Sequence, residues 1–182
     1  LMVMCGDNKS VKCVKLLKKH GAHVNIQDKC GDTALIKASL DNSVYMRSDY
    51  EVRHNIKPMT KKCVKCMKTL LNAGADPNIQ NNNGNTALIR ASCYTSGQPE
   101  IIKCLIKANT NLNIQNKYGN TALMVAAKNG YIGYVKLLLQ KNANMGITNC
   151  NEETCLELLC DCDHIWDMEK KKNCIQIRNK LI

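Results

Sequence analysis

The chain has 182 residues, of which 45% are hydrophobic and only 4% aromatic, with no Phe and a single Trp. This length suits one soluble domain, and no apolar run approaches the roughly 18 residues that a membrane-spanning helix needs, nor does a basic and then apolar leader open the chain. The 26 Lys and Arg against 15 Asp and Glu give a formal net charge of +11, which favours acidic partners. Neither a membrane protein nor a secretory precursor is indicated, and a core without large rings suits thin helical layers.

A repeated unit organises the chain from its start. The string N-I-Q occurs three times and leads each time through a turn-rich tract to T-A-L, whose threonines are Thr33, Thr86 and Thr121. A degenerate fourth copy runs from Asn149 to Leu159, with Thr154 at the Thr position and Glu152 at the Gly position. The last three threonines are 35 and 33 residues apart, whereas the first two are 53 apart, so residues 41–60 form an insertion of about 20 residues.

Each copy predicts a turn and then a short helix. The turn holds a Gly, which adopts a positive φ without steric cost, at Gly31, Gly84 and Gly119. The Thr after it is expected to cap the helix, because its hydroxyl can accept a bond from a free backbone N–H. Ala and Leu follow, so that a neighbouring helix can approach closely.

A second helix is predicted in each unit from apolar residues at i and i+3, such as Val14 with Leu17 and Met67 with Leu70. These helices are expected to stop at residues that tolerate the left-handed conformation, namely Gly21, Gly74, Asn109 and Asn142. Helices of roughly two to three turns are not stable alone in water. Each unit must therefore bury its face on the next, which predicts an elongated stack without a central pocket.

The repeats resemble the ankyrin family, whose period is about 33 residues and whose first helix opens with T-P-L-H-x-A. G-A-x-x-N at Gly21 to Asn25 and G-A-D-P-N at Gly74 to Asn78 carry the same resemblance. Ala34, Ala87 and Ala122 replace the motif's Pro, while Ile36, Ile89 and Met124 replace its His. The Asn, Lys and Ile bias also resembles ankyrin proteins of large DNA viruses.

The resemblance implies an all-α solenoid of stacked helix-turn-helix units with short hairpin turns. We expect one domain over residues 1–182, with an incomplete first repeat over 1–26 and a repeat with the inserted loop over 27–80. Two regular repeats follow over 81–115 and 116–148, and residues 149–182 hold a degenerate repeat and a capping helix at about 166–181.

Twelve cysteines could indicate disulfides, but several lie in apolar helical runs, as Cys13 and Cys104 do. We interpret most of them as reduced, buried residues of an intracellular protein. Cys63-x-x-Cys66 has no second Cys pair to complete a zinc site, and Cys66 falls at a core or edge-of-core position of the repeat.

The C-terminal segment holds a denser group of possible zinc ligands, namely Cys150, Cys155, Cys160, Cys162, His164 and Cys174. Their spacing matches no common zinc pattern, so buried thiols are favoured and no metal or cofactor is expected. No catalytic constellation is visible around the four His, and no nucleophile elbow or phosphate loop is present. The sequence predicts a protein that is not an enzyme.

The resemblance implies a binding face made of the hairpin tips and the exposed side of the first helices. By position it comprises Lys29, Cys30, Asp32, Leu40, Asp41, Asn82, Asn83, Asn85, Cys93, Tyr94, Lys117, Tyr118, Asn120, Lys128 and Asn129. Tyr94 and Tyr118 are the expected anchors, because an exposed ring gives contact area at low entropy cost. In the insertion, Tyr45, Met46 and Tyr50 could form a second contact with the partner, or the loop could be a tolerated insertion.

We therefore expect a monomeric intracellular scaffold that binds another protein through the concave face. The alternative is binding of nucleic acid or another polyanion, for which the charge of +11 argues. That alternative is disfavoured because the lysines are spread along the chain as pairs, such as Lys18 with Lys19 and Lys61 with Lys62, as on a solvated surface. A zinc-dependent module is a third, weaker alternative.

Overall fold

The computed structural model describes residues 8–39, 61–93 and 99–160, which form helices and turns without a strand. The first helix of each unit is short, and these inner helices are α2 (Ala34–Ala38), α4 (Ala87–Ser92), α6 (Ala122–Lys128) and α8 (Cys155–Cys160). The outer helices are longer, namely α1 (Asn8–Lys19), α3 (Lys61–Asn72), α5 (Pro99–Lys107) and α7 (Ile132–Leu139).

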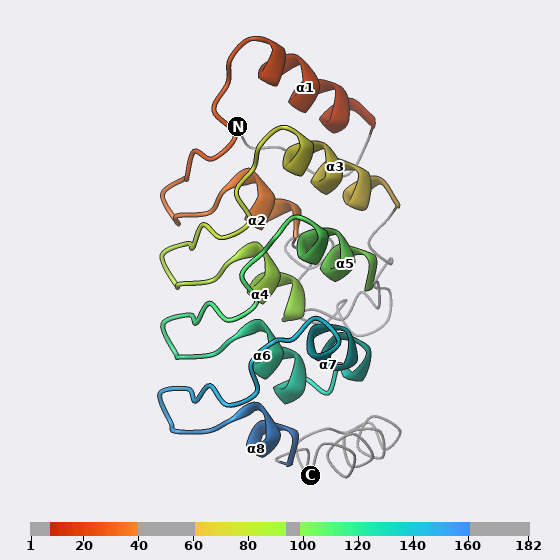
Figure 1. Cartoon of the computed structure of the whole chain (residues 1–182). Coiled ribbons are helices and arrows are strands. Elements are labelled where there is room, and N and C mark those ends of the chain that lie inside the picture. The colour runs from red at the N-terminus through yellow and green to blue at the C-terminus, as the bar shows by residue number, and fades with distance from the viewer. Residues whose placement is uncertain (1–7, 40–60, 94–98, 161–182) are drawn as a thin grey trace, which may run out of the picture.

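The helices form two layers that run along a slender stack (Figure 1). Each inner helix packs on the next inner helix, and each outer helix packs on the next outer helix. Within a unit the two layers meet where α2, α4 and α6 contact α3, α5 and α7. The hairpin turns project from the inner layer, on the side opposite the outer helices (Figure 1). This arrangement confirms the all-α repeat solenoid.

The threonines predicted to open the inner helices do so. Thr33, Thr86 and Thr121 have extended backbones, and each side chain accepts a hydrogen bond from the backbone N–H three residues later. In the fourth unit the carboxylate of Glu157 instead accepts bonds from the N–H and hydroxyl of Thr154. The inner helices have only 5 to 7 residues, shorter than the two to three turns expected.

The outer helices end as predicted, on residues with a left-handed backbone. Their φ values are +76° at Gly21, +92° at Gly74, +55° at Asn109 and +62° at Asn142. At the start of α5, Pro99 occupies the first turn, where its missing N–H has no partner to lose. Local sequence therefore sets the ends of most helices.

The core lies between the two layers and is aliphatic. The i, i+3 pairs predicted for the outer helices supply much of it, with Met67, Leu70, Ile102 and Leu105 fully buried. Small residues of the inner helices, such as Ala38, Ala87 and Ala126, are buried where neighbouring helices approach. The core is thus continuous along the stack and has no closed centre.

The prediction that most cysteines are buried was wrong at two of the positions on which it rested. Cys66 and Cys155 are buried, but Cys13 is exposed and Cys104 only half-buried. Cys13 occupies the same helix position as Cys66, and it differs because no described unit precedes α1 to cover it. Burial therefore depends on place in the stack as well as on position in the repeat.

Several expectations fall outside the described residues. These are the insertion over 41–60 with Tyr45, Met46 and Tyr50, and the capping helix at about 166–181. No helix in the described ranges is long and apolar enough to span a bilayer.

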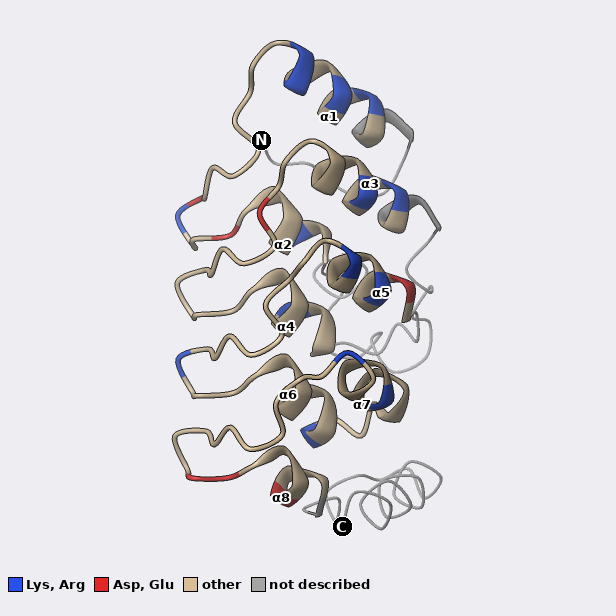
Figure 2. Cartoon of the chain, in the orientation of Figure 1, with Lys and Arg blue, Asp and Glu red and all other residues tan. Residues whose placement is uncertain are grey.

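Charged side chains are unevenly distributed between the two layers. Figure 2 shows lysines along the outer helices, whereas acidic residues are few and lie mainly on the turns. The sequence led us to expect scattered lysines, but helices that are far apart in sequence lie side by side and gather them on one side of the stack.

Candidate interaction face

Each hairpin turn is closed by one amide or carboxylate side chain. The residue after N-I-Q accepts backbone N–H bonds from the second and fourth residues after it. At the third turn, for example, Asn116 Oδ1 accepts from the N–H groups of Tyr118 and Asn120, both at 3.0 Å. The residues in this position are Asp28, Asn81 and Asn116, and Asn149 takes the same position after G-I-T in the last turn. The turns therefore have a fixed shape before any partner arrives.

The same asparagines join neighbouring turns. Asn81 Nδ2 donates to Asp32 Oδ1 at 2.7 Å, and Asn116 Nδ2 donates to Asn85 Oδ1 at 3.0 Å. Asn149 Nδ2 donates to Asn120 Oδ1 at 3.1 Å, which continues the series to the fourth turn. One side chain thus closes its own turn and binds the previous one.

The glutamine of N-I-Q makes a second set of cross-links. Gln80 Nε2 donates to the Gly84 carbonyl at 2.7 Å and to the Gln115 carbonyl of the next unit at 2.9 Å. Gln27 and Gln115 make the equivalent pairs of bonds. The four turns are therefore one hydrogen-bonded array rather than four independent loops.

The turn glycines are needed for two reasons. Their φ values are +74°, +74° and +73° at Gly31, Gly84 and Gly119. A Cβ built on Gly84 would lie 2.8 Å from the backbone nitrogen of Lys117, and one on Gly119 would lie 2.7 Å from that of Cys150. At the equivalent position of the last described turn, Glu152 has φ +62°, and no later described turn packs on it.

The first turn differs from the others because the residue that closes it, Asp28, is a carboxylate and not an asparagine. Lys37 Nζ lies 2.5 Å from Asp28 Oδ2, a pairing that the asparagines at this position in later turns cannot make. The Lys37 ammonium, with the backbone N–H groups of Asp32 and Cys30, lowers the pKa of Asp28 below its ordinary value. The carboxylate of Asp28 in turn raises the pKa of Lys37, so both groups stay charged near neutral pH.

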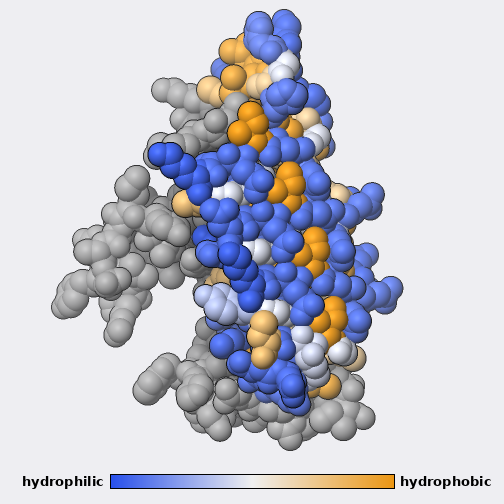
Figure 3. All heavy atoms as spheres, turned by 90° about the vertical axis from the view of Figure 1, so that its left-hand side faces the viewer, coloured by the Kyte–Doolittle hydropathy of each residue, from blue (hydrophilic) through white to orange (hydrophobic). Residues whose placement is uncertain are grey.

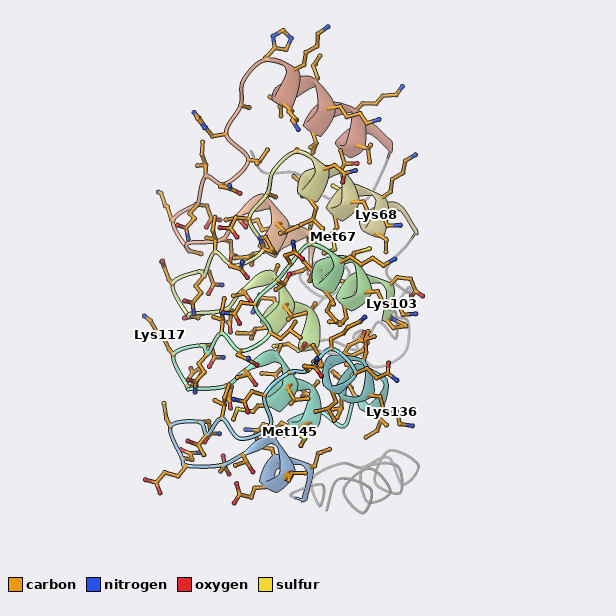
Figure 4. The ribbon with its side chains drawn as sticks, in the orientation of Figure 1. Met67, Lys68, Lys103, Lys117, Lys136 and Met145 are labelled. Atoms are coloured by element: carbon orange, nitrogen blue, oxygen red, sulfur yellow. The ribbon has the colours of Figure 1, made fainter. Side chains whose placement is uncertain are left out.

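The tips of the turns expose the residues that could reach a partner. Tyr118 is 69% exposed, and Lys29, Cys30, Asn83 and Lys117 are also exposed. Figure 4 places Lys117 at the end of its turn, far from the outer helices. These five predicted residues therefore lie together on the projecting edge of the turn array.

Other predicted turn residues support the array instead. Asn85 is buried, and Asp32 and Asn120 accept the bonds from the next turn described above. Asn82 is exposed, but its Nδ2 donates to the Lys29 carbonyl at 2.9 Å. Their side chains hold the turns together, so they position the tips.

A row of isoleucines was missed by the sequence analysis. Figure 3 shows hydrophobic residues running down the hairpin side between hydrophilic ones. The isoleucine of N-I-Q is 62% exposed at Ile26 and partly exposed at Ile79 and Ile114, and Ile147, in G-I-T, takes the same position in the last unit and is also partly exposed. An apolar residue repeated inside a polar turn tract was the signal that could have revealed them.

Three predicted residues lie at the end of the inner helices. Lys128 is exposed, and Asn129 ends α6 with its Nδ2 donating to the Val125 carbonyl at 2.8 Å. Cys93 is half-buried, and burial raises the pKa of its thiol. Leu40, Asp41 and Tyr94 lie outside the described residues.

Nothing in the described geometry favours a metal site. Within residues 8–39, 61–93 and 99–160, no three His, Cys, Asp or Glu side chains come together to hold an ion. Cys155 is buried, and burial raises the pKa of its thiol, which disfavours the thiolate that a metal would need. Cys162, His164 and Cys174 lie outside the described residues.

Comparison with protein families agrees with this architecture. The chain matches ankyrin repeats in three copies over residues 59–149, ankyrin repeats in many copies over residues 3–51, and an ankyrin repeat over residues 30–82. A search of curated proteins finds no match. Ankyrin repeats are generally modules of protein–protein interaction, and proteins built from them are typically non-catalytic scaffolds. With capped inner helices, outer helices and linked turns in each unit, the chain belongs to the ankyrin repeat family.

Proposed function

We propose that this chain is a non-catalytic scaffold that binds a partner protein through the face formed by its hairpin turns and inner helices. The observation that carries the proposal is a strongly exposed aromatic residue, Tyr118, on a turn that the Asn and Gln cross-links hold in place. Tyrosines are enriched among the few interface residues that contribute most of the binding energy.

The linked turns favour binding because they are already ordered. Immobilising a flexible loop costs free energy on association, and a preorganised surface avoids much of that cost. The exposed isoleucine edge adds apolar area beside the polar tips, as in an interface with an apolar centre and a polar rim. The free, exposed thiols of Cys30 and Cys150 fit a reducing, intracellular compartment.

The test compares two variants of the whole chain against a partner obtained by affinity capture and then purified. Tyr118→Ala removes the exposed ring, and we expect its Kd for the partner to rise at least about tenfold, as for an interface hot spot. Adding Tyr94→Ala, the other predicted anchor, should weaken binding further. Calorimetry or biolayer interferometry measures the change.

The matched control is Lys136→Ala, which truncates an exposed residue on the outer helix of the same unit. We expect this control to bind the partner with unchanged affinity. If the control loses as much affinity as Tyr118→Ala, or if neither variant loses any, the hairpin face is not the binding face.

A further inference from the structure

The positive charge of the chain resides on its outer helices. The sequences of α1, α3, α5 and α7 contain twelve lysines and one acidic residue, Glu100, a balance of +11. The formal net charge of the whole chain is also +11, so everything outside these four helices is neutral in sum. Where the structure describes the chain, this division gives the stack a basic side, formed by the outer helices, and a neutral side, formed by the turns and inner helices.

Four lysines form a column along that side. Lys15, Lys68, Lys103 and Lys136 each lie six residues before the left-handed residue that ends their helix. All four are exposed, and Figure 4 shows Lys68, Lys103 and Lys136 one below another on the side away from the turns. Packed helices lie about 8–10 Å apart, so the column extends over roughly 25–30 Å.

Little within the described structure neutralises this column. Lys103 Nζ lies 3.9 Å from the Glu100 carboxylate, with both side chains about half-exposed, so the pair is weak. No ion pair joins Lys15, Lys68 or Lys136 to any residue of the described ranges. Like charges held close together on a rigid stack repel one another, and a polyanion relieves that repulsion.

The basic side is also hollowed between two of its helices. An open groove of about 360 Å³ lies between the C-terminal ends of α3 and α5, and its lining includes Lys68, Lys107 and Cys104. One lysine from each of two neighbouring units thus lines the same depression, which gives an anionic group a basic place to bind. A smooth helix surface would offer only isolated charges.

The chemistry of the surface indicates which polyanion fits. Among the described residues of the outer helices, Tyr134 is buried and no aromatic ring is exposed for stacking a single-stranded base. In the described parts of these four helices, Leu16 is the only strongly exposed large apolar side chain that could anchor a protein partner. Recognition therefore depends on charge alone.

Duplex DNA can place phosphates against the lysine column wherever along its axis it binds. It carries about one negative charge per 1.7 Å of axis, so phosphates are always near a column some 25–30 Å long. An acidic polypeptide would have to place carboxylates at the spacing of the repeats. Stable attachment to a lipid surface generally needs an acyl chain or inserted apolar residues in addition to basic charge.

We propose that the outer face, defined by Lys15, Lys68, Lys103 and Lys136 with the groove beside Lys68 and Lys107, binds the phosphate backbone of double-stranded DNA without sequence preference. This second surface is separate from the hairpin face, so either proposal can fail without the other. A chain that used both could hold a partner protein on DNA.

The experiment compares two triple variants with equal net charge. The first replaces Lys68, Lys103 and Lys136 by Gln on the outer face, and the second replaces Lys29, Lys117 and Lys128 by Gln on the turns and an inner helix. All six side chains are exposed, and Gln is a good helix former, so both variants should fold. Circular dichroism and thermal unfolding check this before binding is measured.

Binding is measured by fluorescence anisotropy with a labelled duplex of arbitrary sequence, about 20 base pairs long, from about 50 to 200 mM salt. We expect the outer-face variant to bind at least about tenfold more weakly than the wild type at the lowest salt, and its salt dependence to be shallower by about 2 to 3 in the log–log slope. The turn variant should stay within about threefold of the wild type.

Each contrary result would overturn the proposal. If both variants bound the duplex equally weakly, only the net charge of the chain would matter. If the wild type did not bind the duplex at the lowest salt, the outer face would not be a DNA-binding surface. Tighter binding of poly-glutamate, or of a single strand of the same length, than of the duplex would assign the face to a different partner. The outer-face variant should still bind the captured partner protein with unchanged affinity. This second measurement separates the test of the outer face from that of the hairpin face.

Discussion

At Gly84 the backbone conformation and the packing of the next unit both require glycine. Its φ of +74° disfavours any side chain, and a Cβ would meet the backbone nitrogen of Lys117 at 2.8 Å. Gly74, at the end of α3, also has a left-handed φ, of +92°, but no atom lies within 4 Å of its Cβ position. Comparing the two glycines therefore separates the cost of a left-handed backbone from the cost of a Cβ that meets the next turn.

We predict that Gly84→Ala destabilises the chain at least twice as much as Gly74→Ala. Left-handed strain alone should lower the free energy of unfolding by about 1–2 kcal/mol in Gly74→Ala. In Gly84→Ala the next turn must also shift and lose cross-links. Urea unfolding monitored by circular dichroism gives both values, and equal losses would mean that the approach of the next turn contributes nothing.

The sequence was sufficient to predict the role of residues that cap or end a helix. Thr33, Thr86 and Thr121 cap helices and Asn109 and Asn142 end them, because these roles depend on backbone groups a few residues away. Burial could not be predicted in the same way. Cys13 and Cys66 share a position in the repeat, yet only Cys66 has a unit on each side to cover it.

At the scale of the structural element, the turns depend on asparagines that a single sequence presents only as turn formers. Asn116 and Asn83 both lie in such tracts, but only Asn116 makes side-chain bonds, to Tyr118, Asn120 and Asn85. Asn83 lies at an exposed tip and takes part through its backbone. The sequence marks both residues as turn formers and does not say which one links the units.

We predict that Asn116→Ala lowers the free energy of unfolding by about 2 kcal/mol, because three bonds of the half-buried amide are lost and the partner groups are left unpaired. Asn83→Ala, the matched control, should change it by no more than about 0.5 kcal/mol. Chemical unfolding of the two variants under the same conditions makes the comparison. A control as unstable as Asn116→Ala would show that the turn sequence matters and the cross-link does not.

The outer helices show the same limit on prediction. Lysines at equivalent positions of these helices are one repeat apart in sequence. Along the chain one therefore sees only neighbouring lysine pairs, which are typical of a solvated surface. Only the stacking of α1, α3, α5 and α7 turns a recurring helix position into a continuous column. The isoleucine row of the hairpin side escaped prediction for the same reason, since the period of the repeat, not that of the helix, aligns it.

For the whole molecule, stacking makes stability a local property. In the described part of the stack the helices of each unit pack mainly on those of adjacent units, so unfolding can proceed from the ends of the stack inward. Helix α1 is at one end of the described stack, where Cys13 is exposed and Leu16 is 58% exposed. Helix α5 has an outer helix on each side, and Leu105 is fully buried there.

We therefore predict that backbone amides of α1 exchange hydrogen with a lower opening free energy than those of α5. Leu105→Ala removes buried contacts at a cost of about 2–5 kcal/mol, and its effect should be largest in α5 and its neighbours α3, α4 and α7. Leu16→Ala, on the exposed flank of α1, should leave exchange in α5 unchanged. Hydrogen exchange followed by mass spectrometry or NMR measures both variants. The contrary result is one opening free energy shared by all helices, which Leu105→Ala lowers by the same amount everywhere. It would mean that the units unfold as one body and that the interfaces between them do not act independently.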